Sequence, residues 1–276
     1  MALETYRYLR GGMAVMIVLL GAAVLIERSG ASCWQTSISA YYFTSAHAVF
    51  IASLCALGAM LIVYKGNSDT EDVLLNLAGV LAFVVAMVPT SRPLSLCGTV
   101  DLGIGDQSAI PNTWAVVIAL VVSRVGAWWM HRHTGTASPR SALGTAATWG
   151  QRLLLAVGLG ALTFAPQWFR ANAHGVAAVA MFTAIIATVA ITAIVVDAGR
   201  YRPVYRSILV AMVLTLMAAV CLHLVLDGFN HAVILVEAAL IGEFAAYWMV
   251  QTVELWGTTV RVGAVTGRDT RLLRAL

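Results

Sequence analysis

Runs of mostly apolar residues alternate with short polar segments along the chain. A helix needs about 20 such residues to cross a bilayer, and it forms there because lipid offers backbone N–H and C=O groups no partner. The pattern therefore predicts an all-α, polytopic membrane protein with eight transmembrane helices in a single domain. They are expected at residues 11–27, 43–64, 73–90, 112–130, 149–165, 173–196, 207–226 and 231–256.

The fifth run is the weakest of the eight. Its apolar core from Leu153 to Ala165 is short and contains Gly158 and Gly160. If this run does not cross the membrane, every later segment changes sides.

Composition changes the picture by excluding a soluble protein. Of the 276 residues, 60% are hydrophobic and 11% are charged, against about 25% charged in an ordinary soluble domain. The first run has Arg7 and Arg10 before it, as a signal peptide would. However, Glu27 and Arg28 separate it from the small residues that cleavage would need, so an uncleaved first span is expected.

The positions of arginine and lysine predict which side each loop faces, because positively charged loops stay in the cytoplasm. Eight spans with a cytoplasmic N-terminus leave only Arg28, Arg92 and Arg170 outside. We therefore expect both termini in the cytoplasm. The net charge of +4 then reflects topology, and no basic patch with interleaved exposed aromatics indicates a nucleic-acid partner. The basic residues expected inside are Arg7, Arg10, Lys65, Arg132, Arg140, Arg152, Arg200, Arg202, Arg206, Arg261, Arg268, Arg271 and Arg274.

A polar cytoplasmic linker at 131–148 lies between four runs and four more, so residues 1–130 and 149–256 are candidate repeats of like orientation, followed by a cytoplasmic tail at 257–276. The string Ala-His-Ala-Val around His47 opens the second run, and Ala-His-Gly-Val around His174 opens the sixth. A chance match in a chain rich in alanine and valine is the alternative.

The four cysteines separate by expected depth. Cys55 and Cys221 fall within spans, where a thiol serves as a small hydrophobe. Cys33 and Cys97 fall in the first two outer loops, where an oxidising compartment permits a disulfide. We expect these two to be bonded; two unrelated free thiols are the alternative.

Ionisable residues gather toward one face of the membrane. Groups of this kind usually face the bundle interior or line a pathway, because they are costly in lipid. We expect them to form an outer-leaflet pocket that binds a small ligand or lipid. Ordinary interfacial positions, with each side chain capping a helix or bonding a loop carbonyl, are the alternative. The pocket residues would be His47, His174, His223, Asp227, His231 and Glu237.

Three of these residues also suggest a metal site. His223, Asp227 and His231 are spaced i, i+4, i+8, and two histidines with a carboxylate are a ligand set for zinc or non-haem iron. Gly228 and Asn230 interrupt the helix there, so only the first two are expected to share a face. A haem between the second and sixth runs lacks an attachment motif.

Glu243 is expected near the middle of the membrane. Arg124 is expected at the same depth, about 18 Å from the outer end of its span at 1.5 Å per residue. An unpaired charge at that depth is costly. We therefore expect an intramembrane ion pair between Arg124 and Glu243; if they lie on opposite sides of the bundle, a proton-coupled transporter becomes the second reading.

Four strings resemble an uncharacterised family of bacterial polytopic membrane proteins of unknown function: SISAYYFTSAHAVF, IVYKGNSDTEDVLLNLAGVLAFVVAMVPT, AHGVAAVAMF and LVEAAL. The resemblance implies class and topology but no activity. The motif positions it implies are Tyr41, Tyr42, Lys65, Gly66, Asn76, Gly79, Pro89, Thr90, His174 and Glu237.

A fainter resemblance is to the superfamily of alkaline ceramidases and progestin/adipoQ receptors, multispan zinc hydrolases of lipid amides. It would make Ser39 or Ser45, with His47, the early Ser/His pair, and Asp227 or Asp72 the acid. The late His-x-x-x-His of that superfamily is replaced here by His-x-x-x-Asp, and Asp72 is expected at the opposite membrane face.

Together these features favour a multi-pass protein of the bacterial cytoplasmic (inner) membrane, within the cell envelope. The leading function is ligand or lipid binding in the outer-leaflet pocket, or service as an accessory subunit of an envelope assembly with a membrane-protein partner. A metal-dependent hydrolase of a lipid ester or amide is the alternative, with zinc or iron as cofactor. A transporter is the third reading.

Overall fold

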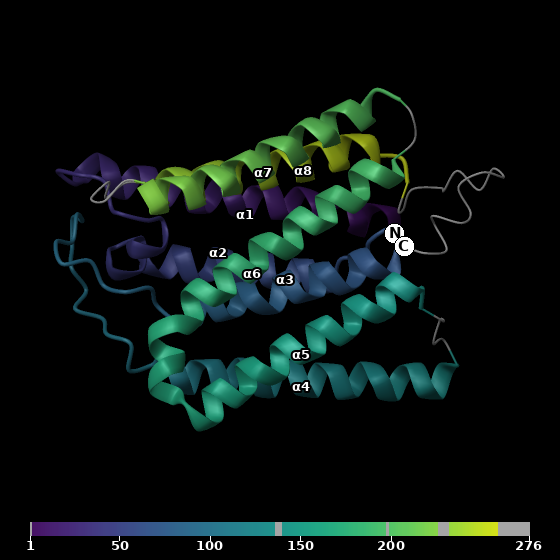
Figure 1. Cartoon of the computed structure of the whole chain (residues 1–276), viewed down its shortest axis with the longest axis horizontal. Coiled ribbons are helices and arrows are strands. Elements are labelled where there is room, and N and C mark those ends of the chain that lie inside the picture. The colour runs from purple at the N-terminus through teal and green to yellow at the C-terminus, as the bar shows by residue number, and fades with distance from the viewer. Residues whose placement is uncertain (1, 136–139, 197–198, 226–231, 259–276) are drawn as a thin grey trace.

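A computed structural model describes residues 2–135, 140–196, 199–225 and 232–258, and within these segments every regular element is a helix. Each of the eight apolar runs corresponds to one α-helix, and Figure 1 shows how these helices pack into a bundle. The elements are α1 (Ala2–Gly30), the 3-10 helix η1 (Ser39–Phe43), α2 (His47–Val63), α3 (Asp69–Met87), α4 (Ala109–Thr134), α5 (Ala142–Phe164), α6 (Pro166–Val195), α7 (Tyr201–Val225) and α8 (Ala232–Glu254).

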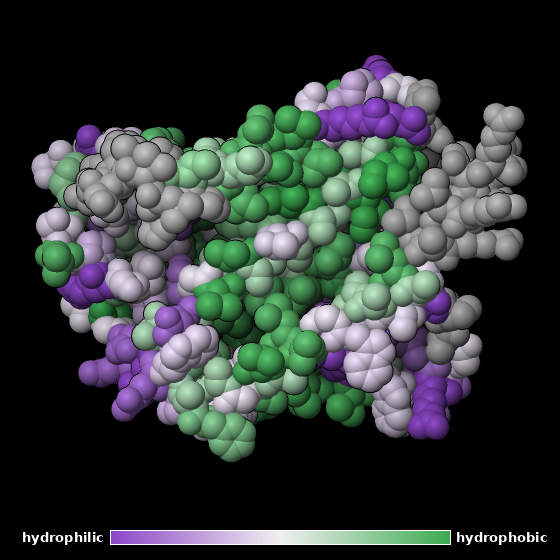
Figure 2. Space-filling view, in the orientation of Figure 1, coloured by the Kyte–Doolittle hydropathy of each residue, from purple (hydrophilic) through white to green (hydrophobic). Residues whose placement is uncertain are grey.

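Six of the helices are long and apolar enough to cross a membrane: α1, α3, α4, α6, α7 and α8. The apolar helix α2 has 17 residues and is shorter. The helix α5 has 23 residues but falls outside this group, in keeping with the weakness of the fifth run. Eight crossings therefore remain a prediction, as do the two half-repeats. Hydrophobic residues cover the middle of the face shown in Figure 2, with hydrophilic ones gathered toward the ends.

The two ends of the bundle differ. At one end, which we call the terminal end, α1 begins and α8 finishes. Arg7 Nε donates to Trp256 O at 2.6 Å there, and Arg10 Nη1 donates to Leu255 O at 2.8 Å. A guanidinium at the last carbonyls of a helix is favourable, because those groups lack partners within the helix. At the opposite end lie residues 35–44, which we call the cap.

Two helices, α3 and α5, begin before their apolar runs with a serine as the capping residue. Ser68 Oγ accepts from Glu71 N–H at 3.2 Å, so α3 begins ahead of the predicted residue 73. Ser141 Oγ likewise accepts from Gly144 N–H at 2.9 Å and begins α5. Side-chain caps of this kind satisfy N–H groups that the first helical turn leaves free.

The main core lies among α1, α2, α3, α6, α7 and α8. Two glycines let α2 and α3 approach closely: a Cβ at Gly58 would lie 2.7 Å from Gly79 O, and one at Gly79 would lie 2.5 Å from Gly58 O. Small residues at a helix contact are a common packing device in membranes, where backbones gain from close approach. By contrast, every residue from 121 to 134 of α4 is exposed.

Candidate functional site

The cap closes one end of the bundle with a mostly buried, irregular segment. All of its residues except Thr36 are buried, and half of it is the helix η1. Short polar side chains satisfy its backbone: Ser37 Oγ accepts from Ala40 N–H at 3.0 Å, and Thr44 Oγ1 donates to Tyr41 O at 2.9 Å. Such local bonds replace those of a longer helix.

The cap is fastened to two other parts of the chain. The disulfide between Cys33 and Cys97 ties its N-terminal flank to the segment that joins α3 to α4, which confirms the predicted pairing. Gln35 Nε2 donates to Cys97 O at 2.5 Å beside this bond. On the other side, Ile234 N–H of α8 donates to Thr36 O at 3.1 Å.

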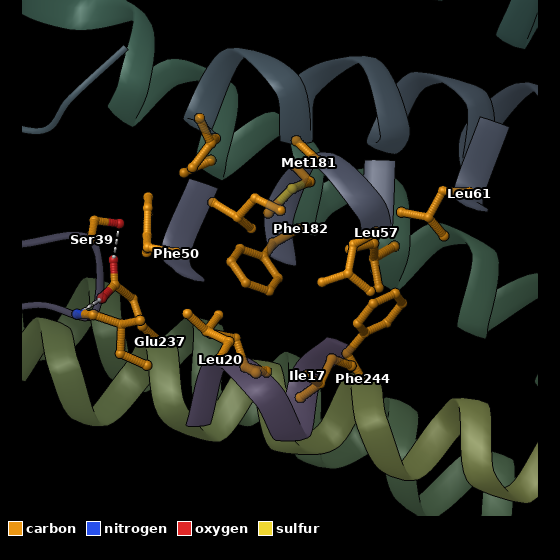
Figure 3. Close-up of a pocket in the computed structure, with 17 residues that line it drawn as sticks. Ile17, Leu20, Ser39, Phe50, Leu57, Leu61, Met181, Phe182, Glu237 and Phe244 are labelled. Carbon is orange, nitrogen blue, oxygen red and sulfur yellow. Dashed lines mark hydrogen bonds between the residues drawn. The ribbon is translucent and has the colours of Figure 1, made fainter. Parts of the chain in front are cut away.

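Glu237 provides a second link between the cap and α8. One carboxylate oxygen accepts from the Ile38 backbone N–H at 2.5 Å, and the other accepts from Ser39 Oγ at 3.2 Å. Figure 3 shows both bonds at the edge of a cavity. Because one carboxylate holds two consecutive residues of the cap, it fixes the position of η1 against α8.

The cavity lies along the bundle axis, among α1, α2, α3, α6, α8 and the cap, with a volume of about 70 Å³. Of the 17 residues that line it, only Ser39 and Glu237 carry polar side chains (Figure 3). Leu57, Leu61 and Phe244 lie toward its other end. The arrangement is a narrow apolar chamber with an acceptor at the cap end, which suits an apolar group that carries a hydrogen-bond donor.

Glu27, on α1, also links separate parts of the chain through hydrogen bonds. This carboxylate is buried and accepts from Thr99 N–H at 2.6 Å, from Thr99 Oγ1 at 2.9 Å and from Ser45 Oγ. It therefore joins α1 to the α3–α4 segment and to the residues just after the cap. From the sequence, Glu27 was expected only to be a polar residue at the end of the first span.

Charges in the loops near the cap are held by short-range bonds. The Gly103 N–H and the Arg92 guanidinium both donate to Asp101, and together they hold the pKa of that carboxyl below its usual value. Burial within the cap raises the pKa of the Tyr41 and Tyr42 phenols, because the charged form is disfavoured away from water.

The two histidines of the repeated motif lie near the cap end, but neither lines the cavity. His47 Nδ1 donates to Tyr42 O at 2.6 Å, and the two rings pack edge to face with their centroids 4.4 Å apart. The buried His174 Nδ1 donates to Val88 O, just beyond α3, at 2.6 Å. Of the predicted pocket residues whose side chains the structure describes, Glu237 lines the cavity, whereas His47 and His174 bind backbone carbonyls.

The predicted metal ligands cannot be placed together. Asp227 and His231 lie outside the described residues. His223 is in α7, where its backbone alone is described. Within the described part of the chain, no three His, Cys, Asp or Glu side chains form a group that could hold a metal ion.

The predicted ion pair of Arg124 with Glu243 is wrong. Glu243 instead accepts from Thr215 Oγ1 of α7 at 2.8 Å, and its other carboxylate oxygen has no partner among the described residues. Arg124 is exposed on α4, and Figure 1 shows α4 and α8 on opposite sides of the bundle. Two residues at equal depth can lie on helices at opposite sides of the bundle. Spacing along the chain therefore could not predict this pair.

The terminal end contains a buried network that the sequence did not single out. Glu71 is buried and accepts from Asn67 N–H at 2.6 Å and from Thr192 Oγ1 at 3.2 Å. Thr192 Oγ1 lies 3.1 Å from Tyr247 Oη, which brings α3, α6 and α8 together. The Ser-x-x-Glu spacing from Ser68 to Glu71, typical of a helix start, was the available signal for this residue.

Comparison with known proteins adds no relative: no family model, no curated protein and no solved structure matches this chain.

Proposed function

We propose that this chain is a multi-pass protein of the bacterial cytoplasmic membrane that binds a small ligand or lipid in the cavity beneath the cap. The observation that carries the proposal is the apolar chamber with a carboxylate at one end. Its lining is apolar apart from Ser39 and Glu237, and a mostly apolar pocket with few polar groups is the usual form of a small-molecule site.

The orientation belongs to the same proposal. Arg7, Arg10, Lys65 and Arg132 lie toward the terminal end, whereas Arg28 and Arg92 lie toward the cap. The positive-inside rule then puts the terminal end in the cytoplasm and the cap outside. A cap on the outer side also suits the disulfide, which an oxidising compartment maintains.

The orientation predicts which engineered thiols react in whole cells. In a background with Cys55 and Cys221 replaced by alanine, a membrane-impermeant thiol reagent should label Gln167→Cys, at the cap end, and leave Thr134→Cys unlabelled. Permeabilised cells should label both positions, which shows that each thiol is accessible. Labelling of Thr134→Cys in intact cells would contradict this orientation, because it would place the terminal end outside the cell.

Native mass spectrometry tests the binding function itself. We expect a bound small molecule or lipid on the purified wild-type protein and none on Ala178→Leu, because Ala178 lines the cavity and a larger side chain would fill it.

Transport is the second candidate function. Glu237 and Glu243 both lie within α8, and neither forms a salt bridge with a basic residue in the part of the chain that the structure describes. Carboxylates without a basic partner inside a membrane protein are typical of proton relays. A metal-dependent hydrolase is the third candidate function, and two of its three proposed metal ligands lie outside the described residues. Service as an accessory subunit of an envelope assembly is compatible with the binding function.

A further inference from the structure

We propose that the cavity takes a primary-amine ligand with a slender apolar body, whose ammonium group replaces the cap as the partner of Glu237. This inference rests on the proposed binding function and names the class of ligand. It also assigns the cap a role, because the groups that the ligand would displace belong to the cap.

The first step is the chemistry of Glu237. An ionised carboxylate offers only acceptor oxygens and carries a full charge. Here it accepts from two neutral donors, the Ile38 N–H and the Ser39 hydroxyl, and no lysine, arginine or histidine among the described residues forms an ion pair with it. A charge among apolar side chains is costly unless an opposite charge accompanies it. An ammonium group would supply both the charge and up to three donors.

The second step is the shape of the cavity. Its volume of about 70 Å³ is roughly half that of an engineered apolar cavity of about 150 Å³ that binds benzene. A cavity of this volume holds only a short unbranched alkyl segment, and a longer chain needs the additional room that displacement of the cap would give. Leu57 and Phe244, at the end away from the carboxylate, would surround the far end of such a chain.

The third step is the position of the cap. Ile38 and Ser39 donate to Glu237 and also line the cavity. A ligand that takes over the carboxylate therefore removes two bonds that hold this wall in place. The cap then has freedom to shift outward, which makes room for a chain longer than the closed cavity holds.

The test uses the full-length protein in a mild detergent and three probes of equal chain length: n-hexylammonium, n-hexanol and hexanoate. Isothermal titration calorimetry should show hexylammonium binding roughly tenfold more tightly than hexanol, because charge-assisted hydrogen bonds are about twice as strong as neutral ones. Hexanoate should show no binding, because its charge repels that of Glu237.

Three variants separate the effect of the carboxylate from that of its surroundings. Glu237→Gln should abolish the preference for hexylammonium over hexanol. The matched control is Glu243→Gln, which alters the other intramembrane glutamate of α8 outside the cavity and should keep the preference. Ser39→Ala removes one competing donor and should tighten hexylammonium binding roughly 2- to 10-fold, the equivalent of one hydrogen bond. That gain would not arise if Ser39 served only to stabilise the fold.

The remaining outcomes distinguish this inference from the function on which it rests. Equal binding of hexylammonium and hexanol, lost in Ala178→Leu, would keep the binding function and overturn the amine class. A hexylammonium preference that survives Glu237→Gln in a folded protein would overturn the assignment of Glu237. No binding of any probe would count against both.

Discussion

Replacing Trp248 with alanine should lower the free energy of unfolding in detergent by about 3 kcal/mol. Trp248 is fully buried and meets Tyr64, Tyr247 and Phe244 edge to face, with ring centroids 5.0, 5.3 and 6.0 Å away. Burying tryptophan gains less against lipid than against water, so we expect the lower end of the roughly 3 to 5 kcal/mol found for such truncations in soluble cores. What is lost is packing contact.

Two further variants show whether burial is the cause. Trp149→Ala removes the same side chain from an exposed position on α5 and should cost less than about 1 kcal/mol. Trp248→Phe should cost less than Trp248→Ala, because it keeps a ring and removes an indole N–H that has no partner among the described residues. Similar losses for Trp149→Ala and Trp248→Ala would contradict this explanation.

Replacing Glu71 with alanine should also lower the free energy of unfolding by about 3 kcal/mol. The change removes the carboxylate that accepts three hydrogen bonds. The donors are the backbone N–H of Asn67, the side-chain amide of Asn67 and the hydroxyl of Thr192. A buried donor that loses its acceptor costs about 1 to 3 kcal/mol, and the Thr192 hydroxyl, which still has Tyr247 Oη 3.1 Å away, contributes less to this loss than the Asn67 groups. Thermal or denaturant unfolding of the purified protein measures the loss.

Glu71→Gln keeps an oxygen acceptor, so we expect it to recover most of the stability that alanine loses. The exposed Glu4 of α1 offers a matched control, since Glu4→Ala should cost less than about 1 kcal/mol. If Glu71→Ala proved as mild as Glu4→Ala, the buried network at the terminal end would not stabilise the protein.

The apolar runs were enough to predict the helices, because a helix in a bilayer satisfies its own backbone and must be apolar over most of its length. The eight expected segments each correspond to an α-helix. The boundaries shifted where polar residues extend a helix, as Ser68 and Ser141 do. The Cys33–Cys97 bond was also predictable, because it depends only on two cysteines lying in loops at one end.

The candidate site was harder to predict, because its contacts join residues far apart in the chain. Glu237 was expected to be important, but its partners are a backbone N–H and a hydroxyl about 200 positions earlier. The cap has no apolar period to indicate that it is buried. The Arg124–Glu243 pair failed for a related reason: the rotation of each helix about its axis and its place round the bundle are set by packing, and depth alone does not give them.

Native mass spectrometry of the protein purified from its membranes tests the binding function most directly. The account predicts one bound small molecule or lipid on the wild type, its absence from Ala178→Leu and its retention by Glu243→Gln, whose altered side chain lies outside the cavity. The same bound species at the same occupancy on Ala178→Leu, or no bound species on the wild type in two unrelated mild detergents, would contradict it.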